Sequence, residues 1–262
     1  MGGMTADSAN LETHLERFGL AAFRPGQREV IEAVLAGKDC LCIMPTGGGK
    51  SLCFQLPSLV REGLTLVVSP LIALMKDQVD SLSRLGIRAT YINSTLEGSE
   101  QTARLRQMAA GGYDLVYVAP ERFRSPFFNE ALRAARLQLL AVDEAHCISE
   151  WGHDFRPDYA RIGTFRRRFN NLQAIARPAT ATPHVREAVM RLPDLHAPET
   201  FITGFARPNL RFEVFSPRGR RDKEELLIDL LRREPGAAIV YAATRRRCEE
   251  IAEALSATLK RR

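Results

Sequence analysis

Short apolar runs rich in β-branched residues alternate with longer amphipathic stretches over most of this chain. This alternation is the feature that constrains the fold most strongly. It is typical of strand–helix–strand units built around a parallel sheet. We therefore predict an α/β fold with one wide, predominantly parallel sheet flanked by helices. The predicted strands span residues 41–44, 64–69, 88–92, 114–119, 137–143, 172–176 and 200–203. The predicted helices span residues 26–36, 50–61, 71–84, 98–110, 158–169 and 184–191, and Pro57 is expected to kink or end the second of them.

The pattern changes after Thr203, because Gly, Pro and Arg accumulate over the next residues and no long helix fits there. We interpret this stretch as a hinge. Beyond it the sequence predicts a helix over 221–233, a strand over 237–241 and a helix over 244–258. Such an opening of a second α/β unit cannot bury both faces of its own sheet, so we expect it to be marginally stable by itself.

The composition limits the possible classes of protein. Of the 262 residues, 45% are hydrophobic, which suffices for a sizeable core and excludes disorder over the whole chain. The formal net charge of +6 permits nucleic-acid binding without demonstrating it. The five cysteines form no CxxC pair, and no apolar signal segment stands at the start. We therefore expect a cytoplasmic protein in a reducing compartment, with no membrane partner.

A glycine-rich turn follows the first predicted strand and leads into a helix. Backbone N–H groups in such a turn and at the start of the helix can converge on phosphate oxygens. Lys50 adds positive charge, and the Ser51 hydroxyl can ligate Mg²⁺. The full GxxxxGKS pattern is not met, because its first glycine would fall at Met44, and a flexible turn is the alternative. The predicted phosphate-binding residues are Thr46, Gly47, Gly48, Gly49, Lys50 and Ser51.

Two carboxylates, Asp143 and Glu144, end an apolar β-rich run. Sheets of α/β proteins place their ligands at the carboxyl ends of strands. Asp143 can therefore hold Mg²⁺ through water, and Glu144 can orient or deprotonate an attacking water molecule. An acidic cap at a strand end is the simpler alternative. Together with the glycine-rich turn, this pair favours a nucleotide hydrolase that uses ATP and Mg²⁺.

Several blocks, in the same order, resemble the motifs of superfamily 2 helicases, and among these the RecQ family of DNA helicases. The longest, DEAHCISEWGHDFRPDY over 143–159, resembles motif II joined to the aromatic-rich loop of that family. The other blocks are FGLAAFRPGQ (18–27), MPTGGGKS (44–51), SPLIALMKDQV (69–79), YVAPER (117–122), TAT (180–182), FARPNL (205–210) and AAIVYAATRRRCEEIAEAL (237–255).

The resemblance implies a RecA-like P-loop NTPase fold and an ATP-dependent DNA helicase that unwinds 3′ to 5′ in DNA repair and recombination. It divides the chain into a first RecA-like ATP-binding lobe (1–204), a hinge (205–220) and an incomplete start of a second RecA-like lobe (221–262). The second-lobe motifs that supply arginine fingers cannot be assigned, so the implied protein is a truncated motor core. Its implied partners are single-stranded and forked DNA, and we expect a monomer.

The resemblance also implies roles for residues around the nucleotide. Gln27 is implied to recognise the adenine edge, with Arg24 packed near the base, and His146 is implied to act with the carboxylates in coupling. Relatives often carry a flat ring at position 20, where this chain has Leu20. The alternative for Arg24 and Gln27 is a solvated first turn of a helix.

The aromatic-rich loop is implied to sense single-stranded DNA and to transmit its binding to hydrolysis. Trp151 and Phe155 offer faces for base stacking, and Arg156 attracts phosphate. A core anchor is the alternative role for Trp151, the one tryptophan of the chain. The residues implied to contact the DNA backbone are Ser69, Lys76, Asn93, Ser94 and Arg122.

The chain departs from the family pattern in motif III. Relatives read ALTATA where residues 176–181 read ARPATA, so Pro178 replaces the first threonine. Proline removes a backbone donor at a strand end, and we expect this to alter the coupling between hydrolysis and movement. Two other functions stay open. One is a catalytically weak, nucleotide-gated DNA-binding module, and the other is a different superfamily 2 translocase or RNA helicase.

Overall fold

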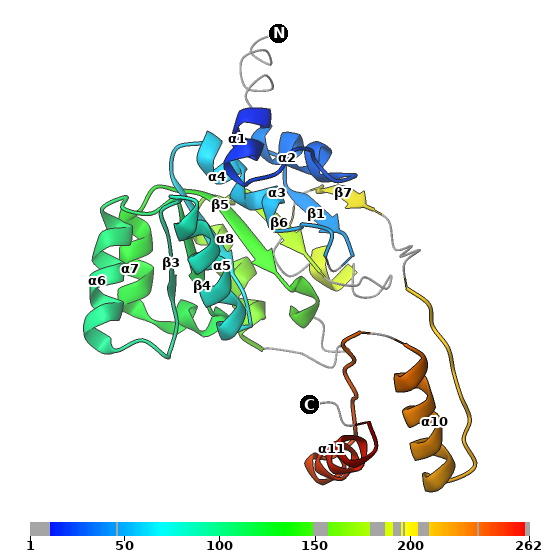
Figure 1. Ribbon diagram of the computed structural model, residues 1–262. Helices are drawn as coiled ribbons and strands as arrows, with labels where there is room; N and C mark the ends of the chain where they lie inside the picture. The colour runs from blue at the N-terminus through cyan, green and yellow to red at the C-terminus, as the bar shows by residue number, and fades with distance from the viewer. Residues whose placement is uncertain are drawn as a thin grey trace. The chain divides into compact units, whose positions relative to one another are not determined.

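The computed structural model describes residues 11–45, 47–148, 157–178, 187–190, 195, 197–203, 210–234 and 236–259 (Figure 1). The chain divides into two compact units, Met1–Ala206 and Arg207–Arg262. The first unit carries the sheet, and the second carries a pair of helices.

A seven-stranded sheet forms the centre of the first unit, in the order β3-β4-β2-β5-β6-β1-β7. Its neighbouring strands pair in parallel, which confirms the predicted α/β class. The strands β1, β2 and β4 are buried along their whole length, as expected where helices cover both faces. Each strand begins and ends within about two residues of its predicted bounds. The strands are β1 (Cys40–Ile43), β2 (Leu64–Val68), β3 (Ala89–Ile92), β4 (Leu115–Val118), β5 (Leu137–Asp143), β6 (Ala174–Arg177) and β7 (Glu199–Ile202).

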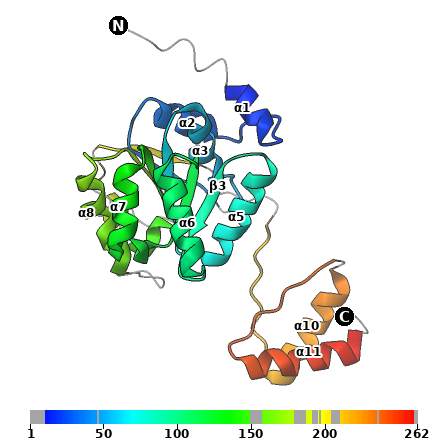
Figure 2. The same cartoon turned by 90° about the vertical axis from the view of Figure 1, so that its left-hand side faces the viewer.

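Helices cover both faces of this sheet (Figures 1 and 2). On one face α2, α3 and α5 contribute side chains such as Phe54 and Met75 to the core. On the opposite face α6, α7 and α8 contribute side chains such as Phe128 and Phe165. The helices of the first unit are α1 (Leu11–Arg17), α2 (Gln27–Leu35), α3 (Leu52–Gln55), α4 (Pro57–Val60), α5 (Ile72–Arg84), α6 (Gly98–Ala109), α7 (Pro126–Ala134) and α8 (Arg161–Arg168). The 3₁₀ turns are η2 (Pro120–Arg124), η3 (Ala145–Ile148) and η4 (Pro157–Ala160).

The predicted helices that fall on described residues agree with this arrangement apart from two omissions and one division. Of the helix predicted over 184–191, residues 187–190 are described and helical, and the others lie outside the described residues. The predicted helix over 50–61 divides into α3 and α4 where Pro57 starts the second of them, as the missing N–H of proline requires. Sequence reasoning missed α1 and α7, whose apolar residues Leu11, Leu15, Phe128 and Leu132 are nonetheless buried. Over the described ranges, no helix is both long enough and apolar enough to cross a membrane.

The second unit contains α10 (Arg220–Arg233) and α11 (Arg245–Leu259). The predicted strand over 237–241 is wrong, because these residues form no strand. A strand needs a neighbour to satisfy its backbone groups, and the described part of this unit offers none. Ile239 and Tyr241 are accordingly 79% and 89% exposed. Ion pairs of Arg220 with Glu250 and of Arg247 with Glu224 join the two helices.

Candidate nucleotide-binding site

The carboxyl ends of three adjacent strands form the candidate site. In the order β5-β6-β1, strand β5 ends at Asp143, β6 ends at Arg177, and β1 leads into the glycine-rich turn. Because the strands are parallel, these three ends lie at the same edge of the sheet, where α/β folds bind ligands.

The glycine-rich turn has a backbone that side chains would disturb. Gly47 and Gly49 have φ angles of 81° and 74°, in the left-handed region that favours glycine. A Cβ atom on Gly48 would lie 2.9 Å from the carbonyl oxygen of Pro45, and one on Gly49 would overlap Nε2 of Gln27. The predicted phosphate residue Thr46 lies outside the described residues. The described glycines of the turn therefore occupy positions that a larger residue would not fit without a shift.

Gln27, the first residue of α2, is hydrogen-bonded to this turn. Its Nε2 donates hydrogen bonds to the carbonyl oxygens of Gly49 (2.9 Å) and Gly48 (3.3 Å), and its Oε1 accepts one from the backbone N–H of Arg24 (2.8 Å). The guanidinium of Arg24 donates to the carbonyl oxygen of Gly47. Gln27 is only 2% exposed, which contradicts a solvated helical turn at this position. Recognition of adenine by Gln27 and Arg24 stays a prediction.

Lys50 and Ser51 follow the glycines at the start of α3. Lys50 is buried, and burial lowers the pKa of its ammonium group, with a further lowering by the nearby charge of Arg177. The charges of Glu144 and Asp143 raise the same pKa, which places both carboxylates within electrostatic reach of Lys50. Ser51 is the N-cap of α3, and its side chain makes no capping hydrogen bond there.

The carboxylates Asp143 and Glu144 follow each other at a sharp turn. Asp143 Oδ1 accepts a hydrogen bond from the backbone N–H of Glu144 (3.0 Å), and the hydroxyl of Tyr159 donates to the carbonyl oxygen of Asp143 (3.0 Å). Glu144 has a φ of 46°, which is uncommon for a residue with a side chain. Its Oε2 lies 3.3 Å from Nδ1 of His146 and, among the described residues, accepts no hydrogen bond. A buried carboxylate oxygen of this kind is available to a ligand or a water molecule.

The residues predicted to contact DNA do not form one exposed surface in this structure. Ser69 and Asn93 follow β2 and β3 but are buried, and Asn93 Oδ1 accepts hydrogen bonds from Thr95. Arg122 is half-buried and donates to Gln101. Lys76 and Ser94 are exposed, and Lys76 forms an ion pair with Asp80. Trp151, Phe155 and Arg156 lie outside the described residues.

Sequence reasoning missed two residues of this site. Tyr159 holds the turn at Asp143, and Arg177 lies against Asp143 itself, with 3.3 Å between Arg177 Nη2 and Asp143 Oδ1. The signal for Arg177 was present, since a charged residue ends an otherwise apolar strand in the altered motif III. Its partner could be recognised only once β5 and β6 were paired.

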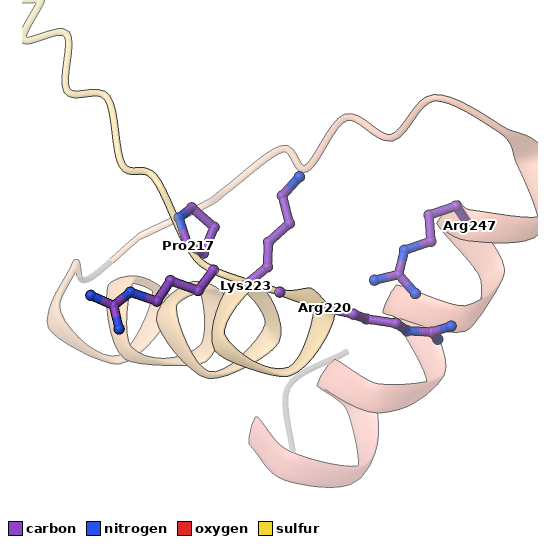
Figure 3. A pocket seen from close by; sticks show the side chains of 6 residues that line it. Pro217, Arg220, Lys223 and Arg247 are labelled. Atoms are coloured by element: carbon purple, nitrogen blue, oxygen red, sulfur yellow. The ribbon is translucent and has the colours of Figure 1, made fainter.

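A hollow in the other unit is lined by basic residues but lacks the glycine-rich turn and the acidic pair. Pro217, Arg218, Gly219, Arg220, Lys223 and Arg247 line it (Figure 3). The two arginines between the helices, Arg220 and Arg247, are already paired with Glu224 and Glu250. We therefore assign no ligand to it.

A parallel α/β sheet with a glycine-rich turn and lysine after one strand and an Asp-Glu pair after another defines the class of P-loop nucleotide-binding proteins. The model of the DEAD/DEAH box helicase family matches residues 24–189. The chain belongs to the DEAD/DEAH box helicase family, on its RecQ branch.

Relatives support that branch. The chain is 44% identical over 241 residues to the ATP-dependent DNA helicase RecQ of Pasteurella multocida, covering 91% of this chain and 37% of that protein. It is 45% identical over 240 residues to the RecQ of Bacillus subtilis, covering 91% of this chain and 40% of that protein. The chain thus spans about two fifths of the length of these relatives.

Solved structures agree on the fold. The DUF1998 helicase MrfA, in a crystal structure bound to DNA and AMPPNP, is 18% identical and gives a TM-score of 0.76 over 98% of this chain and 39% of that one. A hypothetical ATP-dependent RNA helicase from Sulfolobus tokodaii is 21% identical and gives a TM-score of 0.60 over 94% of this chain and 71% of that one. At these identities the likeness shows the fold alone.

Proposed function

We propose that the first unit is the ATP-binding lobe of a RecQ-type DNA helicase motor, which hydrolyses ATP and moves 3′ to 5′ along single-stranded DNA. The observation that carries this proposal is the placement of Lys50 after β1 and of Asp143 and Glu144 after β5, two strand ends at one edge of the sheet on either side of β6. A charged, partly desolvated cluster of this composition suits phosphoryl transfer, in which the protein positions the phosphates and stabilises developing charge.

The residues around the phosphates have distinct roles in this proposal. Backbone N–H groups of the turn over 46–49 and the ammonium group of Lys50 bind the phosphate oxygens. Glu144 orients the attacking water and accepts its proton, which agrees with the buried Oε2 that has no donor among the described residues. His146, 3.3 Å from that carboxylate, adjusts its position and couples it to the DNA-binding loop. Arg24 and Gln27 bind the adenine, for which the Gln27 amide must exchange a hydrogen bond to the turn for one to the base.

The donor set also fits Mg²⁺. Asp143 offers a carboxylate oxygen and Ser51 a hydroxyl that makes no capping hydrogen bond, and oxygen ligands are those that this hard cation prefers. When bound, the ion would neutralise charge on the phosphates. Asp143 and Ser51 would hold it at the edge of the sheet.

The proposal also assigns the parts of the motor and the residues that bind DNA. Residues 1–204 form the first RecA-like lobe, 205–220 the hinge and 221–262 the start of the second lobe. Trp151, Phe155 and Arg156 stack on and attract single-stranded or forked DNA. The residues Ser69, Lys76, Asn93, Ser94 and Arg122 contact its backbone, and the buried members of this set must become accessible for that purpose.

One observation favours a second candidate, a nucleotide-gated DNA-binding module with little turnover. Arg177 lies against the carboxylate proposed to hold Mg²⁺. An ion pair at that oxygen opposes metal binding, and slow hydrolysis would follow.

Measurements of ATP turnover test the proposal. Release of phosphate by the chain is measured alone, with single-stranded DNA and with RNA of the same length, and Lys50→Ala serves as the inactive control. We expect turnover that single-stranded DNA raises more than RNA does and that Lys50→Ala abolishes. Stronger stimulation by RNA would favour an RNA helicase. Nucleotide binding without any turnover would favour the gated module.

A further inference from the structure

Arg177 has its place beside Asp143 because of the sheet register. Asp143 and Arg177 are direct partners in the parallel ladder between β5 and β6. Partner residues in a parallel ladder project their side chains from the same face of the sheet. The alternation of buried residues assigns both to the face covered by α2, α3 and α5, since Ala141 and Ile175, two positions earlier on each strand, belong to that core. The backbone alone therefore brings the two charges together.

The guanidinium of Arg177 is enclosed and incompletely paired. Arg177 is 3% exposed, and its Nη2 lies 3.3 Å from Oδ1 of Asp143. Its Cζ lies 4.7 Å from the centre of the Phe54 ring, in the P-loop helix α3. Its Nε and Nη1 have no hydrogen-bond partner among the described residues. Asp143 is the counter-ion that the described residues offer this buried charge, and its removal would leave the guanidinium desolvated and without that partner.

The pair also changes the charge balance of the described cluster. Lys50 and Arg177 contribute two positive charges, and Asp143 and Glu144 contribute two negative charges, so these four described groups balance one another without a metal ion. The charge of Arg177 is one cause of the lowered pKa of Lys50, which places the guanidinium within electrostatic reach of the P-loop. A divalent cation at Asp143 would meet both of these positive charges.

We propose that Arg177 is a resident counter-ion of Asp143 that competes with Mg²⁺ for this carboxylate and so sets the Mg²⁺ concentration that the chain needs to bind nucleotide. This inference rests on the proposed function, because it takes the site to be a nucleotide site. Arg177 is then a positioning residue, which acts through Asp143 and not on the nucleotide. Binding of Mg²⁺ with nucleotide requires the guanidinium to leave the carboxylate.

A binding experiment with two variants tests this role. A fluorescent, non-hydrolysable ATP analogue is mixed with the full chain while MgCl₂ is titrated, and the midpoint of the Mg²⁺ dependence is recorded. Arg177→Met removes the charge and keeps most of the volume, whereas Arg177→Lys keeps the charge. Arg104→Met is the matched control. Arg104 also lies over an aromatic ring (Tyr91, 4.6 Å) and forms an ion pair with Glu100. It belongs to α6, which carries none of the residues of the nucleotide site.

We expect the midpoint in Arg177→Met to fall by about tenfold, because a unit charge this close to a metal ligand opposes the cation strongly at the effective dielectric of a protein site. Arg177→Lys and Arg104→Met should stay within about threefold of the wild type. Arg177→Gln, whose amide can still donate to Asp143, replaces the methionine variant if thermal unfolding shows that the latter does not fold. This readout is binding, so it does not depend on turnover.

The outcomes separate the inference from the proposed function. If the Mg²⁺ midpoint in the neutral variants falls by less than about threefold, or rises, Arg177 does not compete with Mg²⁺. An equally large fall of the midpoint in Arg177→Lys would overturn the inference too. Absence of nucleotide binding at every Mg²⁺ concentration in the wild type and in all variants would overturn the proposed function and this inference with it. Binding that appears only in the neutral variants would support both.

Discussion

Gln27→Glu is the substitution that most directly tests how α2 holds the phosphate-binding turn. The side chain keeps its size and its Oε1, which accepts from the N–H of Arg24, but an oxygen replaces Nε2. That oxygen would face the carbonyl oxygens of Gly49 and Gly48, to which Nε2 now donates at 2.9 and 3.3 Å. Two hydrogen bonds would therefore become two contacts between acceptors in a buried site.

The expected size of the effect follows from these contacts. A buried acceptor that loses its donor costs about 1–3 kcal/mol, and the longer bond to Gly48 contributes less. The free energy of unfolding of the first unit should thus fall by about 2–4 kcal/mol. Because the lost contacts shape the turn itself, we expect the affinity for a non-hydrolysable ATP analogue to fall about tenfold, which corresponds to about 1.4 kcal/mol.

Gln173→Glu is a matched control. Nε2 of Gln173 also donates to two backbone carbonyl oxygens, those of Val34 (2.7 Å) and Lys38 (2.8 Å), but these lie before β1, at the opposite end of that strand from the glycine-rich turn. Urea unfolding followed by circular dichroism should show destabilisation of both variants, smaller for Gln173→Glu because its carboxylate keeps the guanidinium of Arg61 as a donor. Fluorescence titration with the ATP analogue should show weaker binding for Gln27→Glu alone.

Two results would refute this reasoning. Nucleotide affinity within about twofold of the wild type in a destabilised Gln27→Glu variant would mean that the turn keeps its shape without this amide. An equal loss of affinity in both variants would mean that the effect arises from general destabilisation and not from the contact with the turn.

Three further predictions concern single residues. Glu144→Gln should retain binding of the ATP analogue while losing phosphate release, because the amide cannot accept a proton; intact hydrolysis would end the assignment of Glu144 to water activation. Trp151→Ala should reduce DNA-stimulated hydrolysis much more than DNA-free hydrolysis, and equal losses would argue against a coupling role. In the native chain one thiol, that of Cys248, should react quickly with a thiol reagent, because the other four cysteines are buried. Burial raises the pKa of Cys40 to about 12, so raising the pH to about 9 should not make Cys40 reactive, and release of several thiols would contradict the described core.

Much of the fold and of the nucleotide site follows from local sequence. The strands were predictable because an apolar run of strand length between turn residues has few other ways to bury itself. The glycines of the turn were predictable as well, and the φ angles of Gly47 and Gly49 now give the reason. Asp143 and Glu144 were identified because a pair of acids directly after an apolar strand indicates an edge where ligands bind.

Prediction failed where an element depends on partners distant in sequence. The residues over 237–241 have the composition of a strand, yet they form none in the described unit, because ladder hydrogen bonds need a second strand. The helix α7 was also missed. It is short, and its stability comes from the packing of its buried residues Phe128 and Leu132 against the rest of the unit, which the local sequence does not reveal.

By itself, the sequence determined the class of fold, the phosphate-binding turn and the acidic pair, because each depends on residues that are neighbours along the chain. Only the tertiary structure decided which groups face one another across the site. It directed the amide of Gln27 to the glycine carbonyls and set Arg177 against Asp143. The physical reason is that these contacts follow from strand order and register, which depend on the packing of the whole sheet and leave no mark in any local pattern.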